Sequence, residues 1–202
     1  DIPGAKVVWD KGFLGVVADK EWDAIQAAQK LKVEWSQVEM PFPEQASLYD
    51  HIRKAPVRKR EIGKENGNVD DAFKNAAKVI EAEYEVPFQG HTAFAGAHAT
   101  ADPSNGQMTV YSNDMKSYGM RRGVATFLGM PQDRVRVVYM QGPQGFGRTA
   151  AEDAACEAAY IAREIGRPVR VQWMRDEETA WDTKSPAFLV KMRGALDEQG
   201  RL

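Results

Sequence analysis

Residues 134–166 read RVRVVYM, QGPQGFGRTA and AEDAACEAAYIAREIG in succession, and they pass from a strand pattern through glycines to a helix pattern. The first seven residues alternate β-branched with polar or aromatic side chains, which favours a strand over 134–140. The alanine-rich part that follows predicts a helix over 150–165, which Gly166 ends. A glycine-rich stretch with one phenylalanine therefore stands where a strand leads into a helix.

The glycine-rich stretch 141–150 is the first candidate for a binding site. Glycine has no Cβ, so its amide can approach a ligand closely, and a helix N-terminus adds partial positive charge. Together they make a cradle for an anion or an oxygen-rich cofactor. The P-loop pattern fails because Arg-Thr follows Gly147, and the spacing of Gly142, Gly145 and Gly147 does not match G-x-G-x-x-G. A simple strand-to-helix turn is the structural alternative.

Composition is that of an ordinary globular protein of one large domain or two small ones. The 202 residues are 43% hydrophobic and 28% charged, with a net charge of −2, which gives no electrostatic reason to expect nucleic acid. No apolar run approaches the roughly 18 residues of a membrane-spanning helix. Cys156, the one cysteine, excludes an internal disulfide and a thiolate-rich metal site, and is interpreted as a small packed residue.

Strand and helix patterns alternate along the chain, which predicts a mixed α/β (α+β) domain of layered sheet and helices. We expect a helix after Asp19, which could cap it, a short helix from residue 69, and a helix near 117–128 that ends before Gly129. The other expected strands cover 5–9, 13–18, 32–40, 77–87, 107–112, 168–174 and 187–197.

Three further patterns have plain structural explanations. Residues 41–68 are rich in proline, glycine and basic side chains, and we interpret them as a solvated linker rather than an anion site, because acids interrupt the run. Glu81, Glu83 and Glu85 alternate on one strand and mark its solvent side rather than an acid–base site. Thr149 with the glutamate three residues later predicts a capping box.

Both ends of the chain suggest a fragment. The sequence starts without methionine, and residues 197–200 predict a turn after a strand, with two residues beyond it. The strand over 187–197 is therefore expected to lack its hairpin partner and to expose an apolar edge that favours association.

Several segments in collinear order resemble one enzyme family. The relevant stretches are GFGR (145–148), EDAACEAAYIAREIGRPVRVQWMRDEE (152–178), VYSNDMKSYGMRRGVATFLGMPQDRVRVV (110–138) and YEVPFQGHTAFAGAHATAD (84–102). They resemble the molybdopterin-binding large subunit of the molybdenum hydroxylases, the xanthine dehydrogenase and aldehyde oxidase superfamily. PFPEQASLYDHIRKAPV (41–57) and GNVDDAF (67–73) are most similar to the branch of nicotinate dehydrogenase and the isoquinoline 1-oxidoreductase beta subunit.

The resemblance implies a domain plan. Residues 1–40 correspond to the end of a hammerhead-like α/β domain, residues 41–68 to a linker, and residues 69–202 to the first part of a molybdenum cofactor-binding domain.

The resemblance also implies chemistry and partners. The cofactor is a molybdenum pterin, with the cytosine dinucleotide form as one option, and 2Fe–2S clusters lie on a partner subunit. In the family a glutamate deprotonates Mo–OH, its oxygen attacks an electron-poor carbon of an N-heterocycle or aldehyde, and hydride passes to a sulfido ligand. The implied partners are an iron–sulfur small subunit and, as an option, a cytochrome c subunit. The compartment, bacterial cytoplasm or periplasm, stays open.

The resemblance assigns cofactor contact to one run of residues: Gln144, Gly145, Phe146, Gly147 and Arg148. Gln144 adds a side-chain amide where the family uses backbone. The catalytic glutamate of the family lies downstream of these residues, so no catalytic residue is expected in this chain, and the chain alone is expected to lack hydroxylase activity.

Other positions depart from the family pattern. Met115 stands where many members carry glutamine, and it cannot donate a hydrogen bond. Ala95 and Gly96 stand where members carry a glutamate and a proline, while His91 keeps a family histidine. We expect His91 and His98 to make structural hydrogen bonds rather than to bind metal. These departures leave open a non-catalytic assembly module of the same fold. The glycine-rich stretch leaves open a nucleotide-binding domain, against which the missing lysine and the glycine spacing argue.

Overall fold

The computed structural model describes residues 2–142, 145–146 and 151–202. By their contacts these residues form two compact units. The first, which we call the sheet unit, comprises Asp1–Trp35 and Gly90–Lys184. The second, which we call the ribbon unit, comprises Ser36–Gln89 and Ser185–Leu202. Each is described by itself.

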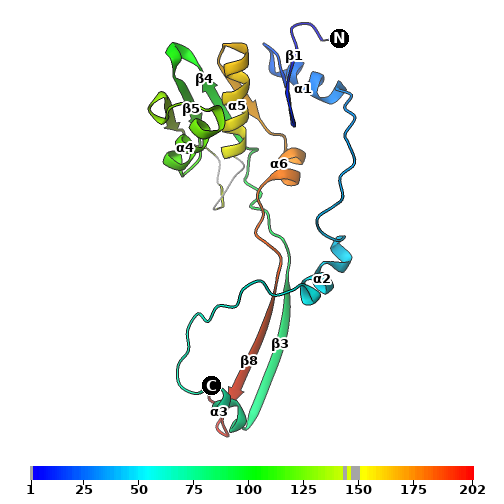
Figure 1. Ribbon diagram of the computed structural model, residues 1–202, viewed down its shortest axis with the longest axis vertical. Helices are drawn as coiled ribbons and strands as arrows, with labels where there is room; N and C mark the ends of the chain where they lie inside the picture. Colours follow the sequence, from blue (N-terminus) through cyan, green and yellow to red (C-terminus); the bar gives the residue numbers. More distant parts are fainter. Residues whose placement is uncertain (1, 143–144, 147–150) are drawn as a thin grey trace. The chain divides into compact units, whose positions relative to one another are not determined.

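The sheet unit is built on a four-stranded mixed sheet with the order β6-β5-β4-β7 (Figure 1). Strand β4 pairs antiparallel with β5 and with β7, while β5 and β6 are parallel. A parallel pair needs a crossover, and helix α4 supplies it. The strands are β4 (His98–Asp102), β5 (Met108–Ser112), β6 (Val135–Tyr139) and β7 (Val169–Gln172).

Helices α4 (Ser117–Leu128) and α5 (Ala151–Ile165) pack on this sheet and on each other. The side of α5 that faces the sheet is made almost entirely of alanine, so the helix backbone can lie close to β4 and β7. These alanines are fully buried: Ala154, Ala155, Ala158, Ala159 and Ala162. Cys156 packs against the same core, as expected for a small packed residue.

A hairpin and a helix precede the sheet in the chain: β1 (Lys6–Asp10), β2 (Phe13–Val17) and α1 (Glu21–Lys30). The ring of Phe13 lies edge-on to Tyr160 of α5, with their centroids 5.3 Å apart. The Tyr160 hydroxyl donates to Asp10 over 3.0 Å, so the hairpin is fastened to α5 at two points. Asp19 was expected to cap α1; instead Lys20 is the N-cap residue, and Asp19 pairs with Arg167 at 3.0 Å.

The ribbon unit consists of two long antiparallel strands and two short helices (Figure 1). Strand β3 pairs with β8 in continuous register from Lys78–Leu196 to Val86–Phe188. The elements are α2 (Leu48–Lys54), α3 (Val69–Lys74), β3 (Lys78–Val86) and β8 (Phe188–Leu196). Strand β3, more than 100 residues earlier, pairs with all of β8, so the last strand has one partner that the sequence did not reveal. Among the described residues no strand pairs with the other edge of β8, as expected for a strand without its hairpin partner.

The two faces of this ribbon are chemically opposite. Both helices lie on the charged face: Arg53 of α2 pairs with Glu83 at 2.8 Å and with Glu85, and Phe73 of α3 lies 4.1 Å from the Arg193 guanidinium. A hydrogen bond from Arg53 and, to a smaller extent, one from Lys191 lower the pKa of Glu83 below its ordinary value. The three alternating glutamates thus form ion pairs on the helix-covered side of the strand, as structural carboxylates.

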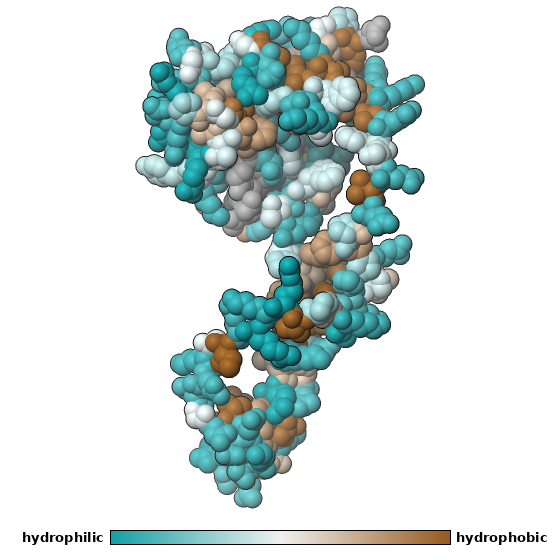
Figure 2. All heavy atoms as spheres, viewed as in Figure 1, coloured by the Kyte–Doolittle hydropathy of each residue, from teal (hydrophilic) through white to brown (hydrophobic). Residues whose placement is uncertain are grey.

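The other face of the ribbon is apolar and half-exposed. The pairing brings Ile80, Ala82, Tyr84 and Val86 onto one side with Phe188, Val190 and Met192. Between 44% and 57% of the surface of Phe188, Ile80, Tyr84 and Met192 is exposed. Figure 2 shows brown hydrophobic side chains among teal charged ones along this part of the chain.

Most predicted elements are confirmed, and so is the mixed α/β class. The helix 117–128 agrees at both ends, and Gly129 ends it with a φ of +64°. The strand expected over 32–40 is wrong: those residues are neither helix nor strand, and Trp35, Val38 and Met40 are exposed. An alternating pattern makes a strand only where another strand is available to pair with it.

Some elements were not anticipated from sequence. These are α2, β4, α6 (Arg175–Trp181) and three short 3₁₀ segments, η1 (Gln45–Ser47), η2 (Ser104–Gly106) and η3 (Gln132–Arg134). Within the expected irregular linker 41–68, residues 56–68 have no regular secondary structure, but η1 and α2 form in its first half, contrary to that expectation. In the described part of the chain, no helix combines the length and the apolar character needed to span a membrane.

Candidate binding site at the carboxyl ends of the parallel strands

The glycine-rich stretch begins where the parallel strands β5 and β6 end. Ser112 pairs with Tyr139 at this end of the register, and the Met140 amide donates to the Ser112 carbonyl over 2.8 Å. The chain that leaves β5, from Asn113 onward, therefore lies beside the chain that leaves β6. In α/β sheets the crevice outside the carboxyl ends of parallel strands is the usual place for a ligand.

Gly142 is in close contact with the turn after β5. A Cβ on Gly142 would lie 2.7 Å from Asn113 Cβ and 2.8 Å from Asn113 Nδ2, closer than real side chains approach. Glycine is required here because the side chain of Asn113 lies directly against the Gly142 backbone.

The same turn carries two buried oxygen atoms, Asn113 Oδ1 and Asp114 Oδ2, for which the described residues supply no hydrogen-bond partner. Only 9% of the Asp114 surface is exposed. Its other oxygen, Oδ1, accepts from the Lys116 amide over 3.0 Å, and its own amide donates to Ser112 Oγ over 3.3 Å. A polar atom left in this state costs free energy unless a ligand or water supplies the missing donor.

Of the five residues predicted to contact a cofactor, the structure describes Gly145 and Phe146. Phe146 has a φ of +46°, in the left-handed region that side chains other than glycine rarely adopt, and 63% of its surface is exposed. Its ring therefore points out of the core, available to a ligand. Gln144, Gly147 and Arg148 lie outside the described residues, as does Thr149 of the expected capping box.

Two more large side chains near the end of β5 are exposed. Met115 has 69% of its surface exposed, and Tyr118, in the first turn of α4, has 87% exposed. Met115 offers no hydrogen-bond donor, so any polar recognition in this turn falls to its neighbours Asn113 and Asp114. Sequence reasoning had singled out Met115 and missed both neighbours; their two polar side chains directly after a strand were the available signal.

His91 and Ala95 belong to a separate polar cluster between residues 91–97 and α6. Arg175 donates to the carbonyls of Ala93 and Phe94, at 2.6 and 2.9 Å, and pairs with Glu178 at 3.0 Å. Burial raises the pKa of the Glu178 carboxyl, because only 2% of the residue's surface is exposed. The positive charge of Arg175 opposes that rise.

The histidines of this cluster make separate structural contacts. The His91 amide donates to Asp182 over 3.4 Å, and His98 Nδ1 lies 3.1 Å from the Gly96 carbonyl oxygen. Across the described residues no group of three or more His, Cys, Asp or Glu side chains is arranged to hold a metal ion.

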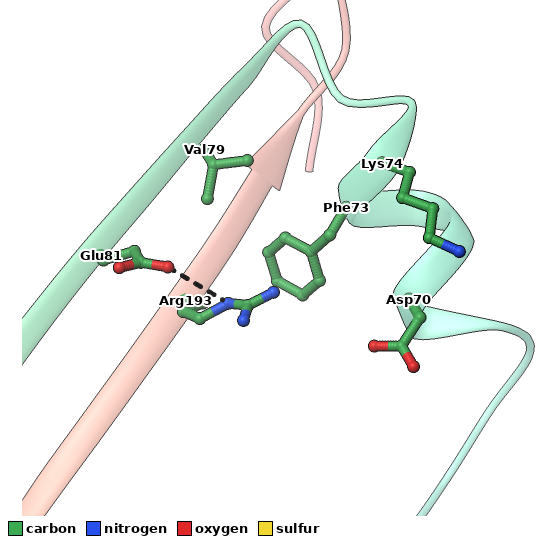
Figure 3. Close-up of a pocket in the computed structure, with 6 residues that line it drawn as sticks. All are labelled: Asp70, Phe73, Lys74, Val79, Glu81 and Arg193. Carbon is green, nitrogen blue, oxygen red and sulfur yellow. Dashed lines mark ion pairs between the residues drawn. The ribbon is translucent and has the colours of Figure 1, made fainter.

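The ribbon unit has an open groove of about 420 Å³ between α3 and the strands (Figure 3). Figure 3 shows Phe73 and Arg193 facing each other across it, and Glu81 paired with Arg193 at 3.4 Å. Lys74 also forms an ion pair, with Asp71 at 3.5 Å, and the groove is open to solvent, so none of its lining residues has an unsatisfied buried polar atom.

Solved structures of a quinoline oxidoreductase and of a CO dehydrogenase have the same fold. Quinoline 2-oxidoreductase from Pseudomonas putida 86 superposes with a TM-score of 0.69 at 19% identity, over 90% of this chain and 24% of that chain. Reconstituted CO dehydrogenase from Oligotropha carboxidovorans superposes with a TM-score of 0.71 at 18% identity, over 92% and 26%. These likenesses define the class of fold.

The family follows from the sequence. The model of the molybdopterin cofactor-binding domain matches residues 53–202, and the chain belongs to this family. A nicotinate dehydrogenase subunit of Pseudomonas putida KT2440 is 32% identical over 200 residues, which are 98% of this chain and 17% of that protein. A probable xanthine dehydrogenase subunit of Bacillus subtilis 168 is 28% identical over 93% of this chain and 26% of its own length.

The chain thus spans between about a sixth and a quarter of the length of these relatives. Its cofactor is of the molybdopterin type, as the resemblance implied. The described residues fit such a group: Asn113 Oδ1 and Asp114 Oδ2 are buried acceptors for which the described residues supply no donor, and the ring of Phe146 is exposed. The predicted division of the chain into residues 1–40, 41–68 and 69–202 stays a prediction.

Proposed function

We propose that this chain is the cofactor-binding part of a molybdenum hydroxylase subunit that oxidises an N-heterocyclic aromatic compound or an aldehyde. The observation that carries the proposal is the family match over residues 53–202, in which the glycine-rich stretch begins at the carboxyl end of the parallel strands. The 32% identity to the nicotinate dehydrogenase subunit favours the N-heterocycle over the aldehyde.

When bound, the molybdenum cofactor supplies the oxygen-transfer and hydride-accepting chemistry. The residues of this chain bind and orient it. Residues 144–148 would hold the cofactor, and the exposed ring of Phe146 would be available to contact it. No residue of this chain is assigned the proton-transfer step, which we attribute to a glutamate in another segment of the subunit.

The proposal includes partners. Electrons leave through 2Fe–2S clusters on an iron–sulfur small subunit, with a cytochrome c subunit as a further acceptor. Residues 1–40 are proposed to end a hammerhead-like domain, with residues 41–68 as linker and 69–202 as the start of the cofactor-binding domain.

Molybdenum analysis of the full-length complex tests the proposal. Purified after growth with adequate molybdate, the complex should contain about one molybdenum and one pterin per subunit, and it should reduce an electron acceptor in the presence of a heterocycle such as nicotinate. Absence of molybdenum under these conditions contradicts the proposal.

Phe146→Ala in the full-length protein tests the role of the loop. Because Phe146 is 63% exposed, the variant should keep its melting temperature within the range of an ordinary surface substitution, rather than lose the roughly 3–5 kcal/mol of a buried phenylalanine. Turnover should fall more than molybdenum content. A large loss of stability with unchanged turnover per molybdenum would show that the glycine-rich stretch is only a strand-to-helix turn without a binding role.

A non-catalytic assembly module of the same fold is the second candidate. It is favoured by Ala95 and Met115, which are exposed and offer no polar group where the family pattern has a glutamate and a glutamine. A complex that contains molybdenum and pterin but turns over none of the heterocycles or aldehydes supplied would identify this module.

A further inference from the structure

The chain carries two Asn-Gly pairs whose surroundings differ. Asn66-Gly67 lies in the segment 56–68, which has no regular secondary structure, and both residues are exposed. Asn105-Gly106 belongs to the tight turn η2 between β4 and β5. We propose that Asn66 is a site of spontaneous deamidation in the native protein, and that the fold protects Asn105 from the same reaction.

The modification needs only the chain and water. The backbone nitrogen of Gly67 attacks the side-chain carbonyl carbon of Asn66, and the new N–C bond closes a five-membered succinimide ring. The side-chain nitrogen of Asn66 leaves as ammonia, which carries away the proton lost by the attacking amide. Water then opens the ring at one of its two C–N bonds, so the product is aspartate or isoaspartate. One carboxylate replaces one amide, with no oxidant or cofactor involved.

The surroundings of Gly67 leave this ring closure unhindered. A side chain on the residue that supplies the attacking nitrogen would crowd the carbonyl carbon, and glycine has none. No atom lies within 4 Å of the place where a Cβ of Gly67 would be. The backbone hydrogen bonds of the described turns and loops include none from the Gly67 amide. The reacting groups can therefore rotate toward each other without breaking a contact of the fold.

The second pair is held in a geometry that opposes ring closure. Asn105 and Gly106 have φ of +57° and +68°, as the two central residues of a type I′ turn require. The Gln107 amide closes this turn by donating to the Ser104 carbonyl over 3.1 Å, and the turn joins two paired strands. The Gly106 nitrogen can attack only after the Asn105 backbone rotates out of the turn, so this end of the hairpin must open first.

Peptide mapping by mass spectrometry measures both sites in one sample of the full-length protein, incubated in mildly alkaline buffer. The carboxylate product at Asn66 should accumulate about tenfold faster than at Asn105, because the hydrogen bond that closes the second turn must break before its ring can form. In denaturant the two sites should react at similar rates, since the turn that protects Asn105 is then lost.

Asn66→Gln is the matched variant. It keeps a side-chain amide at the same exposed position, but its cyclisation would need a larger ring, so product at residue 66 should disappear while the rate at Asn105 stays unchanged. An Asn66 that reacts in denaturant but stays unmodified in the native protein would overturn the inference. Equal rates at Asn66 and Asn105 in the native protein would overturn it as well.

Discussion

At the scale of single residues, Gly96 explains one departure from the family pattern. A Cβ at this position would lie 2.2 Å from the carbonyl oxygen of Trp173, because the two backbones run side by side beyond the β4–β7 pair. The Trp173 amide donates to the Ala97 carbonyl over 2.8 Å at the same place. The proline of other members is therefore incompatible with this local backbone.

Gly96→Ala should destabilise the sheet unit by about 1–3 kcal/mol, since the methyl group can be accommodated only by moving backbone. Chemical denaturation monitored by circular dichroism measures the change. Gly123→Ala is the control: Gly123 lies inside α4 with no atom within 4 Å of its Cβ position, and alanine there should stabilise by about 0.5–1 kcal/mol. Equal effects of the two substitutions would contradict the close approach.

At the scale of elements, the short helix α6 secures the segment 91–97. Arg175 binds two carbonyls of that segment, and Glu178 from the next turn orients Arg175. The helix is too short to be stable alone, so its place depends on these contacts. Sequence patterns could not reveal it, because its partners lie about 80 residues away.

Arg175→Ala should lower the stability of the protein at pH 7 by on the order of 1–3 kcal/mol, because it leaves the Glu178 carboxylate unpaired in a buried site. The pKa of Glu178 is already raised by burial, and loss of Arg175 raises it further. A carboxyl group whose pKa is raised in the folded state destabilises that state when it is ionised. The variant should therefore regain stability as the pH falls through the folded-state pKa of Glu178 and the carboxyl takes up a proton.

Urea denaturation of Arg175→Ala between pH 7 and pH 5 provides the measurement. The double variant Arg175→Ala, Glu178→Gln should lose this pH dependence, because it has no buried carboxylate to protonate. A stability deficit that is the same at both pH values would show that the lost carbonyl contacts, rather than the charge of Glu178, dominate.

At the scale of the whole molecule, the two units differ in the core that stabilises them. The sheet unit buries a continuous cluster of side chains from its strands and from α4 and α5. In the ribbon unit, all of whose residues are described, Leu48 is the one residue classed as buried, and one face of the strands is apolar and half-exposed. Apolar burial is the main source of folding free energy, so the two units should differ in local stability.

Native-state hydrogen exchange should therefore show amides of β3 and β8 exchanging at lower free energy than amides of β4 and β5. Adding the remainder of the subunit should slow exchange in β3 and β8 if it covers their apolar face. Exchange of all four strands at one common free energy would contradict this division. The expectation that the chain associates through exposed apolar surface stays a prediction, testable by sedimentation velocity.

Local patterns in the sequence were sufficient for most elements. Alternating β-branched residues predicted β6 and β7, and the glycine after Leu128 predicted the end of α4, because both depend on contacts within a few residues. The glycine-rich stretch between β6 and α5 was predicted as a binding site because glycine has no Cβ, so a ligand can approach the backbone. That property depends on no residue distant in the sequence. The same reasoning failed for 32–40, where no partner strand is available.

Tertiary structure decided which strands pair, which residues are buried and which face of the ribbon the helices cover. The β3–β8 pair joins segments about 110 residues apart, and the helices cover its charged face because Arg53 and Phe73 find partners there. Asn113 and Asp114 are ordinary turn residues in the sequence. In the folded chain the parallel pairing of β5 and β6 brings Gly142 against Asn113, and one side-chain oxygen of each of these two turn residues is buried. Hydrogen-bond satisfaction depends on neighbours distant in sequence, so it can be read only from the folded chain.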